Sequence, residues 1–154
     1  MENDYSDVEI LLVEDNPDDS ELVAHAIKDV VKSLHLVHLK DGVETLSYIF
    51  GEKAKENGKV ITSLRLVLLD LKLPKIDGLE VLRKIRQDYR TTAVPVVILT
   101  SSREKRDITE AYRLGVNSYV VKPVAFNSFV EKIGAIAFYW SHINEKPELA
   151  TEQS

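Results

Sequence analysis

Polar and charged side chains follow four short apolar segments of the sequence, at the points where those segments end. Each segment is rich in Val, Ile and Leu, which is typical of a strand buried on both faces of a parallel sheet. The side chains that follow them are Glu14 with Asp15, then Asp70, Thr100 and Lys122. A carboxylate at the end of a buried strand, such as Asp70, needs a partner cation, a solvent-filled crevice or a chemical role.

Three carboxylates that converge on one crevice repel one another unless a cation neutralises them. The sequence contains no cysteine, and its histidines are scattered without ligand spacing, so a metal ion at this place would have oxygen ligands. Such a donor set favours Mg²⁺, or Mn²⁺, over Zn²⁺. A metal ion beside a lysine and a hydroxyl can gather phosphoryl oxygens, and a neighbouring carboxylate can then act as a nucleophile.

The elements that position these residues alternate between strands and amphipathic helices. We expect strands at residues 8–13, 34–39, 65–70, 94–99 and 117–121, and helices at 17–33, 43–50, 79–89, 104–114 and 127–143. Asn16 is suited to cap the amino end of the first helix, and a hydroxyl of the 100–102 loop can cap the amino end of the fourth helix. Gly115 is suited to cap the carboxyl end of the fourth helix. A long polar loop is expected at 51–63.

This alternation predicts one doubly wound α/β domain, in which a five-stranded parallel sheet is covered by five helices on its two faces. Parallel strands end at the same edge of a sheet, and sites in such folds lie outside that edge. We therefore expect the four polar strand ends to meet. The domain is predicted to span 8–143 and to be followed by a polar tail at 144–154.

The composition sets limits on location and partners. The 154 residues are 44% hydrophobic and 29% charged, as in an ordinary globular domain. No apolar stretch reaches the length of a membrane span, and the acidic amino terminus is unlike a secretory signal, so we expect a cytoplasmic protein without membrane contact. The net charge of −5 disfavours nucleic-acid binding.

Four motifs together resemble a known family. VEDN from Val13, LDLKLPKIDG from Leu69, LTSS from Leu99 and YVVKP from Tyr119 closely resemble the receiver domain of bacterial two-component response regulators. The resemblance covers about residues 8–143, and the motifs occur in the family's order. It implies a flavodoxin-like fold with strand order 2-1-3-4-5, and, since no output domain follows, a stand-alone receiver.

The resemblance assigns the acidic residues to a phosphoacceptor site. It implies that Asp70 accepts a phosphoryl group from the phosphohistidine of a sensor histidine kinase. It also implies that Glu14, Asp15, Asp70 and the backbone carbonyl of Lys72 hold Mg²⁺. Such a protein is a switch that catalyses only its own phosphotransfer and dephosphorylation.

The remaining strand ends carry the switch roles that the family implies. Thr100 is expected to hydrogen-bond a phosphoryl oxygen and to move when that oxygen appears, with Tyr119 turning inward behind it. Lys122 is expected to pair with the phosphoryl group, and Pro123 to follow it through a cis peptide bond, a form that is common only before proline.

Three further features resemble the receivers associated with bacterial phytochrome kinases: the long 51–63 segment, the DLKLPKIDG form and the ending AFYWSHI. This implies a phytochrome-type sensor kinase as partner. Lys72 departs from that subgroup, which commonly has Asn there, and a cation at this position could alter the lifetime of the acyl phosphate. The aromatic residues of the last helix suggest a homodimer through the fourth helix, fifth strand and fifth helix.

Each residue also has an ordinary structural explanation when taken alone. Glu14 and Asp15 fit a solvated loop, Thr100 a helix cap, Lys122 a surface charge and Tyr119 core packing. Three other functions compete with the receiver assignment. A haloacid-dehalogenase-like phosphatase needs a second Asp where this chain has Lys72; a flavin-binding module needs a loop of Ser, Thr and Gly amides rather than EDNPDD; and a docking-only receiver would not need the intact site.

Overall fold

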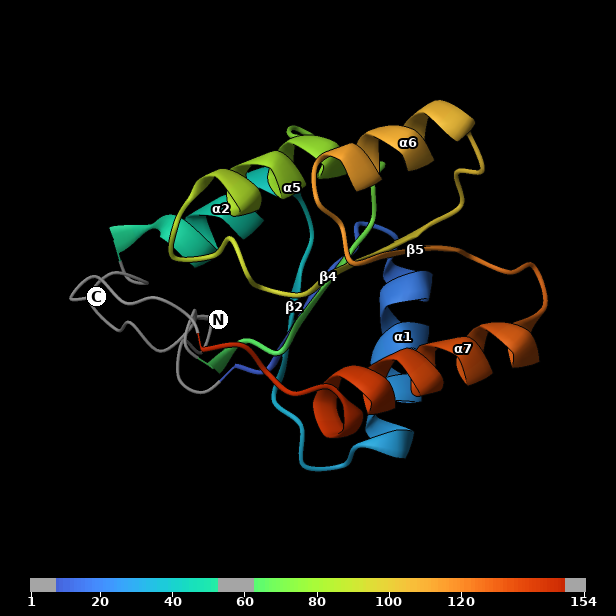
Figure 1. Cartoon of the computed structure of the whole chain (residues 1–154). Coiled ribbons are helices and arrows are strands. Elements are labelled where there is room, and N and C mark those ends of the chain that lie inside the picture. The colour runs from blue at the N-terminus through green and yellow to red at the C-terminus, as the bar shows by residue number, and fades with distance from the viewer. Residues whose placement is uncertain (1–7, 53–62, 149–154) are drawn as a thin grey trace.

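The computed structural model describes residues 8–52 and 63–148, and its centre is a parallel sheet (Figure 1). The strands lie in the order β2-β1-β3-β4-β5, and every neighbouring pair is parallel. This confirms the predicted fold class and strand order. The strands are β1 (Ile10–Val13), β2 (Leu36–Leu39), β3 (Leu66–Leu69), β4 (Val96–Thr100) and β5 (Ser118–Val121).

Helices cover both faces of the sheet. In Figure 1, α1 and α7 lie on one face, while α2, α5 and α6 lie on the other. Within the described residues these are five α-helices, as predicted, and the last continues into a π-helical turn. Their bounds are α1 (Pro17–Val30), α2 (Gly42–Phe50), α5 (Gly78–Gln87), α6 (Lys105–Arg113), α7 (Phe126–Phe138) and the π-turn η1 (Tyr139–Ile143).

Alternate residues of each central strand pack into two separate cores. In β1, Leu11 and Val13 face the core under α2, α5 and α6, whereas Ile10 and Leu12 face the core under α1 and α7. Strands β3 and β4 are divided in the same way, and all their residues are buried. A strand with no polar face can be accommodated only between two helical layers, which explains the apolar runs of the sequence.

Short polar side chains begin the helices next to the site edge. Asn16 Oδ1 accepts hydrogen bonds from the backbone N–H groups of Asp18 and Asp19, at 2.9 and 3.1 Å. Asp77 caps α5 in the same way, and Gly115, with φ of 96°, follows the end of α6. The Asn16 and Asp77 caps fix loops that leave the carboxyl ends of β1 and β3, whereas Gly115 ends α6 before β5.

The start of α6 differs from the expectation. The N-cap residue of α6 is Glu104, not one of the hydroxyl residues at 100–102, and its side chain makes no capping hydrogen bond. One of the expected hydroxyls still takes part: Ser102 Oγ accepts from the Glu104 N–H at 3.3 Å and donates to Asp107 at 2.6 Å. Most of the polar loop expected at 51–63 lies outside the described residues. Among the described residues, no helix is long and apolar enough to cross a membrane.

Candidate phosphoacceptor and metal site

Backbone hydrogen bonds fix the candidate residues at one edge of the sheet. The Glu14 N–H donates to the carbonyl of Leu39, and the Asp70 N–H donates to the carbonyl of Val13. The Lys122 N–H donates to the carbonyl of Thr100 at 2.7 Å. Because each of these residues follows a paired strand, its side chain leaves the sheet at the same edge, as the sequence predicted.

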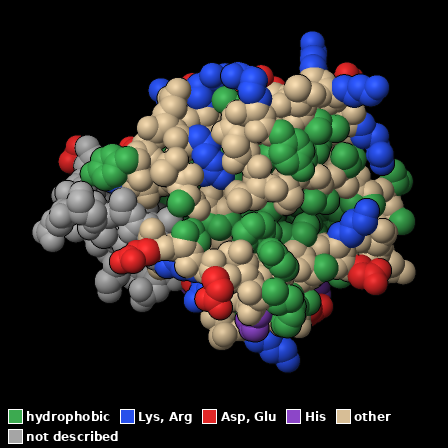
Figure 2. Space-filling model, viewed as in Figure 1, with side chains coloured by type: hydrophobic (Ala, Val, Ile, Leu, Met, Phe, Trp, Pro, Cys, Tyr) green, Lys and Arg blue, Asp and Glu red, His purple; other side chains and the backbone are tan. Residues whose placement is uncertain are grey.

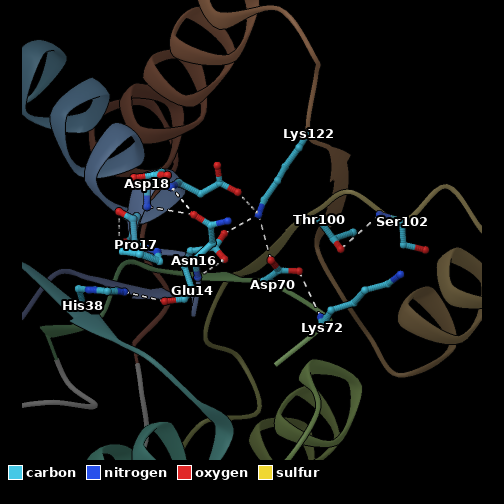
Figure 3. A network of polar contacts seen from close by, with 12 residues as sticks. Glu14, Asn16, Pro17, Asp18, His38, Asp70, Lys72, Thr100, Ser102 and Lys122 are labelled. Carbon is cyan, nitrogen blue, oxygen red and sulfur yellow. Dashed lines mark hydrogen bonds and ion pairs between the residues drawn. The ribbon is translucent and has the colours of Figure 1, made fainter. Parts of the chain in front are cut away.

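Lys122 lies at the centre of this edge, where its ammonium group contacts three carboxylates (Figure 3). Its Nζ is 2.5 Å from Glu14 Oε1, 2.9 Å from Asp19 Oδ2 and 3.0 Å from Asp70 Oδ2. Only 12% of the Lys122 side chain and 2% of the Glu14 side chain are exposed to solvent. Charges this well buried require partners, and the arrangement provides them for both signs.

Burial and charge change the acidity of two of these groups. Removal from water, assisted by the negative charge of Asp70, raises the pKa of Glu14 to about 7, although the contact with Lys122 opposes this shift. Burial alone would lower the pKa of Lys122, but its hydrogen bonds to Glu14, Asp19 and Asp70 outweigh burial and raise it. Lys122 is therefore a permanent cation, while Glu14 can exchange a proton near neutral pH.

The donor set of this edge fits a hard divalent cation. Glu14, Asp15 and Asp70 each offer a carboxylate oxygen, and these oxygens lie within 4.8 Å of one another. Asp15 is exposed, whereas the other two are buried, so a bound ion would retain access to water. Oxygen-only ligands with room for water are the preference of Mg²⁺ and Mn²⁺. Lys72 contributes its backbone N–H to Asp70 Oδ1 at 3.2 Å.

A glycine brings the next helix close beneath Asp70. A Cβ atom at Gly78 would lie 2.2 Å from the Asp70 carbonyl oxygen and 2.6 Å from Leu71 Cα, closer than real Cβ contacts permit. The Gly78 N–H also donates to the carbonyl of Leu71 at 2.8 Å. This close approach clamps the loop after β3, and with it the Asp70 backbone, against the start of α5.

Thr100 and Tyr119 meet at the loop between β4 and α6. Thr100 is fully buried at the end of β4, and its Oγ1 accepts a hydrogen bond from the Ser102 N–H at 3.4 Å. The Tyr119 hydroxyl donates to the carbonyl of the same Ser102 at 3.0 Å, and Ser102 Oγ donates to Asp107 at 2.6 Å. Ser102 therefore connects both predicted switch residues to α6.

The peptide bond before Pro123 differs from the expectation. None of the described peptide bonds is cis, so the predicted cis bond between Lys122 and Pro123 is wrong for this structure. Bonds before proline favour trans by only about 0.5–1 kcal/mol, and the trans form here still lets the Lys122 ammonium reach Asp70. Motif order alone could not determine the isomer.

Sequence reasoning missed two contributors to the site. Asp19 has a charge that favours the first turn of α1, but its carboxylate also contacts Lys122. His38 was treated as a scattered histidine, yet its Nε2 lies 2.7 Å from the Glu14 carbonyl oxygen. A signal for Asp19 existed: it lies four residues before Val23, in line with the buried stripe of α1.

Comparison with known proteins defines the class to which this fold and site belong. Residues 10–134 match the model of the response regulator receiver domain. The probable methanogenesis regulatory protein FilR2 of Methanothrix harundinacea is 40% identical over 139 residues, which are 90% of this chain and 86% of that protein. The chain belongs to the response regulator receiver domain family.

Response regulators with solved structures are similar to this chain in both sequence and fold. The response regulator Rcp1 of Synechocystis is 36% identical over 85% of this chain and 87% of its own. Its Mn²⁺-bound crystal structure has a TM-score of 0.82, covering 91% of this chain and 99% of that one at 34% identity. The phosphorylated cyanobacterial phytochrome response regulator RcpA has a TM-score of 0.83 at 34% identity, covering 91% and 98%. The chain is thus a receiver-domain response regulator whose relatives include phytochrome-associated proteins.

Proposed function

We propose that this response regulator is switched by phosphorylation of Asp70, with a sensor histidine kinase as the phosphoryl donor. The observation that carries the proposal is the surroundings of Asp70. One of its carboxylate oxygens contacts the Lys122 ammonium, and carboxylate oxygens of Asp70, Glu14 and Asp15 lie within 4.8 Å of one another. A structural strand-end carboxylate would need none of these neighbours.

In the proposed reaction, a carboxylate oxygen of Asp70 attacks the phosphorus of a phosphohistidine. The new O–P bond forms as the N–P bond breaks, and the electron pair of that bond returns to the imidazole nitrogen, which takes up a proton. Lys122 pairs with the transferred phosphoryl group, and the buried Thr100 hydroxyl donates a hydrogen bond to one of its oxygens. Both residues stabilise negative charge on the phosphoryl oxygens, which is the main catalytic requirement of phosphoryl transfer.

We propose Mg²⁺ as the cation, held by Glu14, Asp15, Asp70 and the carbonyl of Lys72. Bound Mg²⁺ supplies positive charge to the phosphoryl oxygens during transfer. The Mn²⁺-bound structure of the relative Rcp1 supports a divalent ion in this family. Lys72 adds a second cation next to Asp70. Figure 3 shows its side chain on the opposite side of Asp70 from Lys122, where we expect it to influence water access to the acyl phosphate.

The proposed output is a change in the partner-binding surface formed by α6, β5 and α7. Thr100 and Tyr119 both contact the Ser102 loop, so movement of Thr100 toward a phosphoryl oxygen would disturb the start of α6. A groove of about 490 Å³ lies beside this loop, lined by Tyr119, Val120 and Ile136 among others. Figure 2 shows hydrophobic side chains gathered between α6 and α7. Phosphorylation shifts the population of such a surface rather than creating a new fold.

The phytochrome-associated relatives support a phytochrome-type kinase as the partner. Because a histidine kinase takes its phosphoryl group from ATP, we propose that the protein acts in the cytoplasm. A homodimer through α6, β5 and α7 is also proposed, because Phe138, Tyr139 and Ile143 are exposed near the end of α7. Sizing across a concentration series, with and without phosphodonor, tests this. An unchanging monomer mass would exclude the dimer.

Incubation with a small-molecule phosphodonor and Mg²⁺, followed by intact mass measurement, tests the proposed chemistry. We expect the wild type to gain one phosphoryl group and Asp70→Asn to gain none. Equal gain by both proteins would disprove the assignment of Asp70. Absence of gain in the wild type would support a docking-only receiver, and sustained turnover of a generic phosphoester would support a phosphatase.

A further inference from the structure

The three carboxylates around Lys122 are not equivalent. Glu14 and Asp70 belong to the group whose oxygens lie within 4.8 Å of one another and fit a divalent cation, whereas Asp19 does not. All three nevertheless contact the same ammonium group, at 2.5, 3.0 and 2.9 Å respectively. Lys122 therefore has two partners that a metal ion would also bind and one partner that it would not.

Asp19 is held in position by the start of α1. Its backbone N–H donates to the capping oxygen of Asn16 at 3.1 Å, and its side chain, which is 34% exposed, reaches Lys122. The adjacent Asp18 is capped by the same oxygen but is exposed, and Figure 3 shows it turned away from Lys122. The two aspartates have the same charge and occupy the same helical turn, but Asp19 lies four residues before the fully buried Val23, whereas Asp18 lies four before the partly buried Leu22.

Metal and ammonium compete for the same two carboxylates. The ammonium contacts one oxygen of Glu14 and one of Asp70, and a divalent ion needs an oxygen from each. When the ion binds, the ammonium must weaken these contacts without leaving the site, where only 12% of its side chain is exposed. A buried ammonium that loses its partners is costly, so a third carboxylate outside the metal group makes this exchange easier.

We infer that Asp19 is a positioning residue, which holds the Lys122 ammonium beside Asp70 while Glu14 and Asp70 bind the divalent ion. By keeping Lys122 in place, Asp19 reduces the competition between ammonium and metal. This inference rests on the proposed function, because it concerns the same metal site. It can fail while Asp70 still accepts a phosphoryl group.

Titration of the purified full chain with Mn²⁺, followed by the electron paramagnetic resonance signal of free Mn²⁺, tests the inference. We expect Asp19→Asn to weaken Mn²⁺ binding about three- to tenfold more than Asp18→Asn, the range typical of coupling between contacting charged groups. Asp18→Asn removes the same charge from the same turn, and it therefore measures the general electrostatic effect.

The same pair of substitutions is then made in a Lys122→Met background. If Asp19 acts through Lys122, the excess effect of Asp19→Asn disappears there, and the two Asn variants bind Mn²⁺ equally. A persistent excess would show that Asp19 acts on the ion directly, and equal effects in the wild-type background would show that it acts only as a distant charge. Either result overturns the inference.

Chemical labelling of Lys122 gives a second measurement that does not depend on the folding of the Lys122→Met variant. The metal-saturated protein is treated with an amine-reactive ester, and the labelling rate of Lys122 is followed by peptide-resolved mass spectrometry. We expect Asp19→Asn to speed labelling at least threefold. In the metal-saturated protein, Glu14 and Asp70 bind the ion, so this substitution removes the remaining carboxylate partner of the Lys122 ammonium. Asp18→Asn should leave the rate unchanged. Unchanged labelling in both variants would also overturn the inference.

Discussion

Replacing Lys122 by methionine should destabilise the metal-free protein in a way that depends on pH. Met preserves much of the chain length but removes the charge, which leaves the carboxylates of Glu14 and Asp70 buried without their cation. Removing one partner of a buried ion pair typically costs about 3–5 kcal/mol. For a chain of 154 residues, this corresponds to a fall in Tm of about 6–20 °C.

Proton uptake limits the loss of stability caused by Lys122→Met, and this limit makes the loss depend on pH. An unpaired buried carboxylate can take a proton instead of remaining charged. For a carboxyl with an unperturbed pKa of about 4.3, this costs about 5 kcal/mol at pH 8 but only about 1 kcal/mol at pH 5. The folded variant has a raised carboxyl pKa and binds more protons than the unfolded chain. Its stability is therefore retained at low pH and lost as the pH rises through the folded pKa.

Thermal unfolding followed by circular dichroism at pH 5 and pH 8, each with EDTA or with Mg²⁺, provides the assay. We expect the variant to lose most stability at pH 8 in EDTA and to recover with Mg²⁺, since a ligand at 100 times its Kd contributes about 2.7 kcal/mol. Mg²⁺ should raise the Tm of the variant more than that of the wild type, whose ammonium competes with the ion. If the two proteins melt within about 2 °C of each other at pH 8 in EDTA, a difference too small for an unpaired buried charge, the reasoning is wrong.

Three further outcomes are expected. Gly78→Ala should lower the free energy of unfolding in urea by about 1–3 kcal/mol and weaken metal binding, because its Cβ would overlap the Asp70 carbonyl. The control Gly134→Ala, whose Cβ would meet only a Val30 methyl, should change neither quantity. Below pH 7, the Mg²⁺ affinity of the wild type should fall up to tenfold per pH unit in calorimetric titrations, because Glu14 has its pKa raised to about 7 and must lose its proton to bind; a flat profile would contradict this. Arg86→Met should cost about 2–3 kcal/mol in urea unfolding, because the guanidinium donates three hydrogen bonds that join α5 to neighbouring loops, and an unchanged midpoint would refute it.

The fold was predictable because its signals are redundant. Apolar runs in β1, β3 and β4 indicated strands buried on both faces, and the intervening amphipathic segments required parallel connections. Strand boundaries shifted by about two residues because hydrophobic residues such as Val8 and Val94 are buried without pairing as strand. The strand order came from the family resemblance, since periodicity does not determine which strands are neighbours.

Local conformations were less accessible from the sequence. The bond before Pro123 is trans, and the N-cap residue of α6 is Glu104 rather than one of the hydroxyl residues before it. In both places the competing states differ by about 0.5–2 kcal/mol, and the tertiary surroundings decide between them. The backbone conformation of Lys75, with φ of 70°, was also not predictable from the sequence, because Lys rarely adopts this conformation without support from its surroundings.

The contact between Asp19 and Lys122 lies between these two cases. The residues are 103 positions apart, and nothing in either local sequence specifies the pair. Helical geometry nevertheless distinguishes Asp19 from Asp18, because a position four residues before the buried Val23 lies on the face of α1 turned toward the sheet. An acidic residue that extends an apolar stripe toward a sheet edge must meet a cation there or pay the cost of burial. Lys122 is the cation that the strand ends offered, so combining the helical phase with the strand-end rule would have predicted the pair.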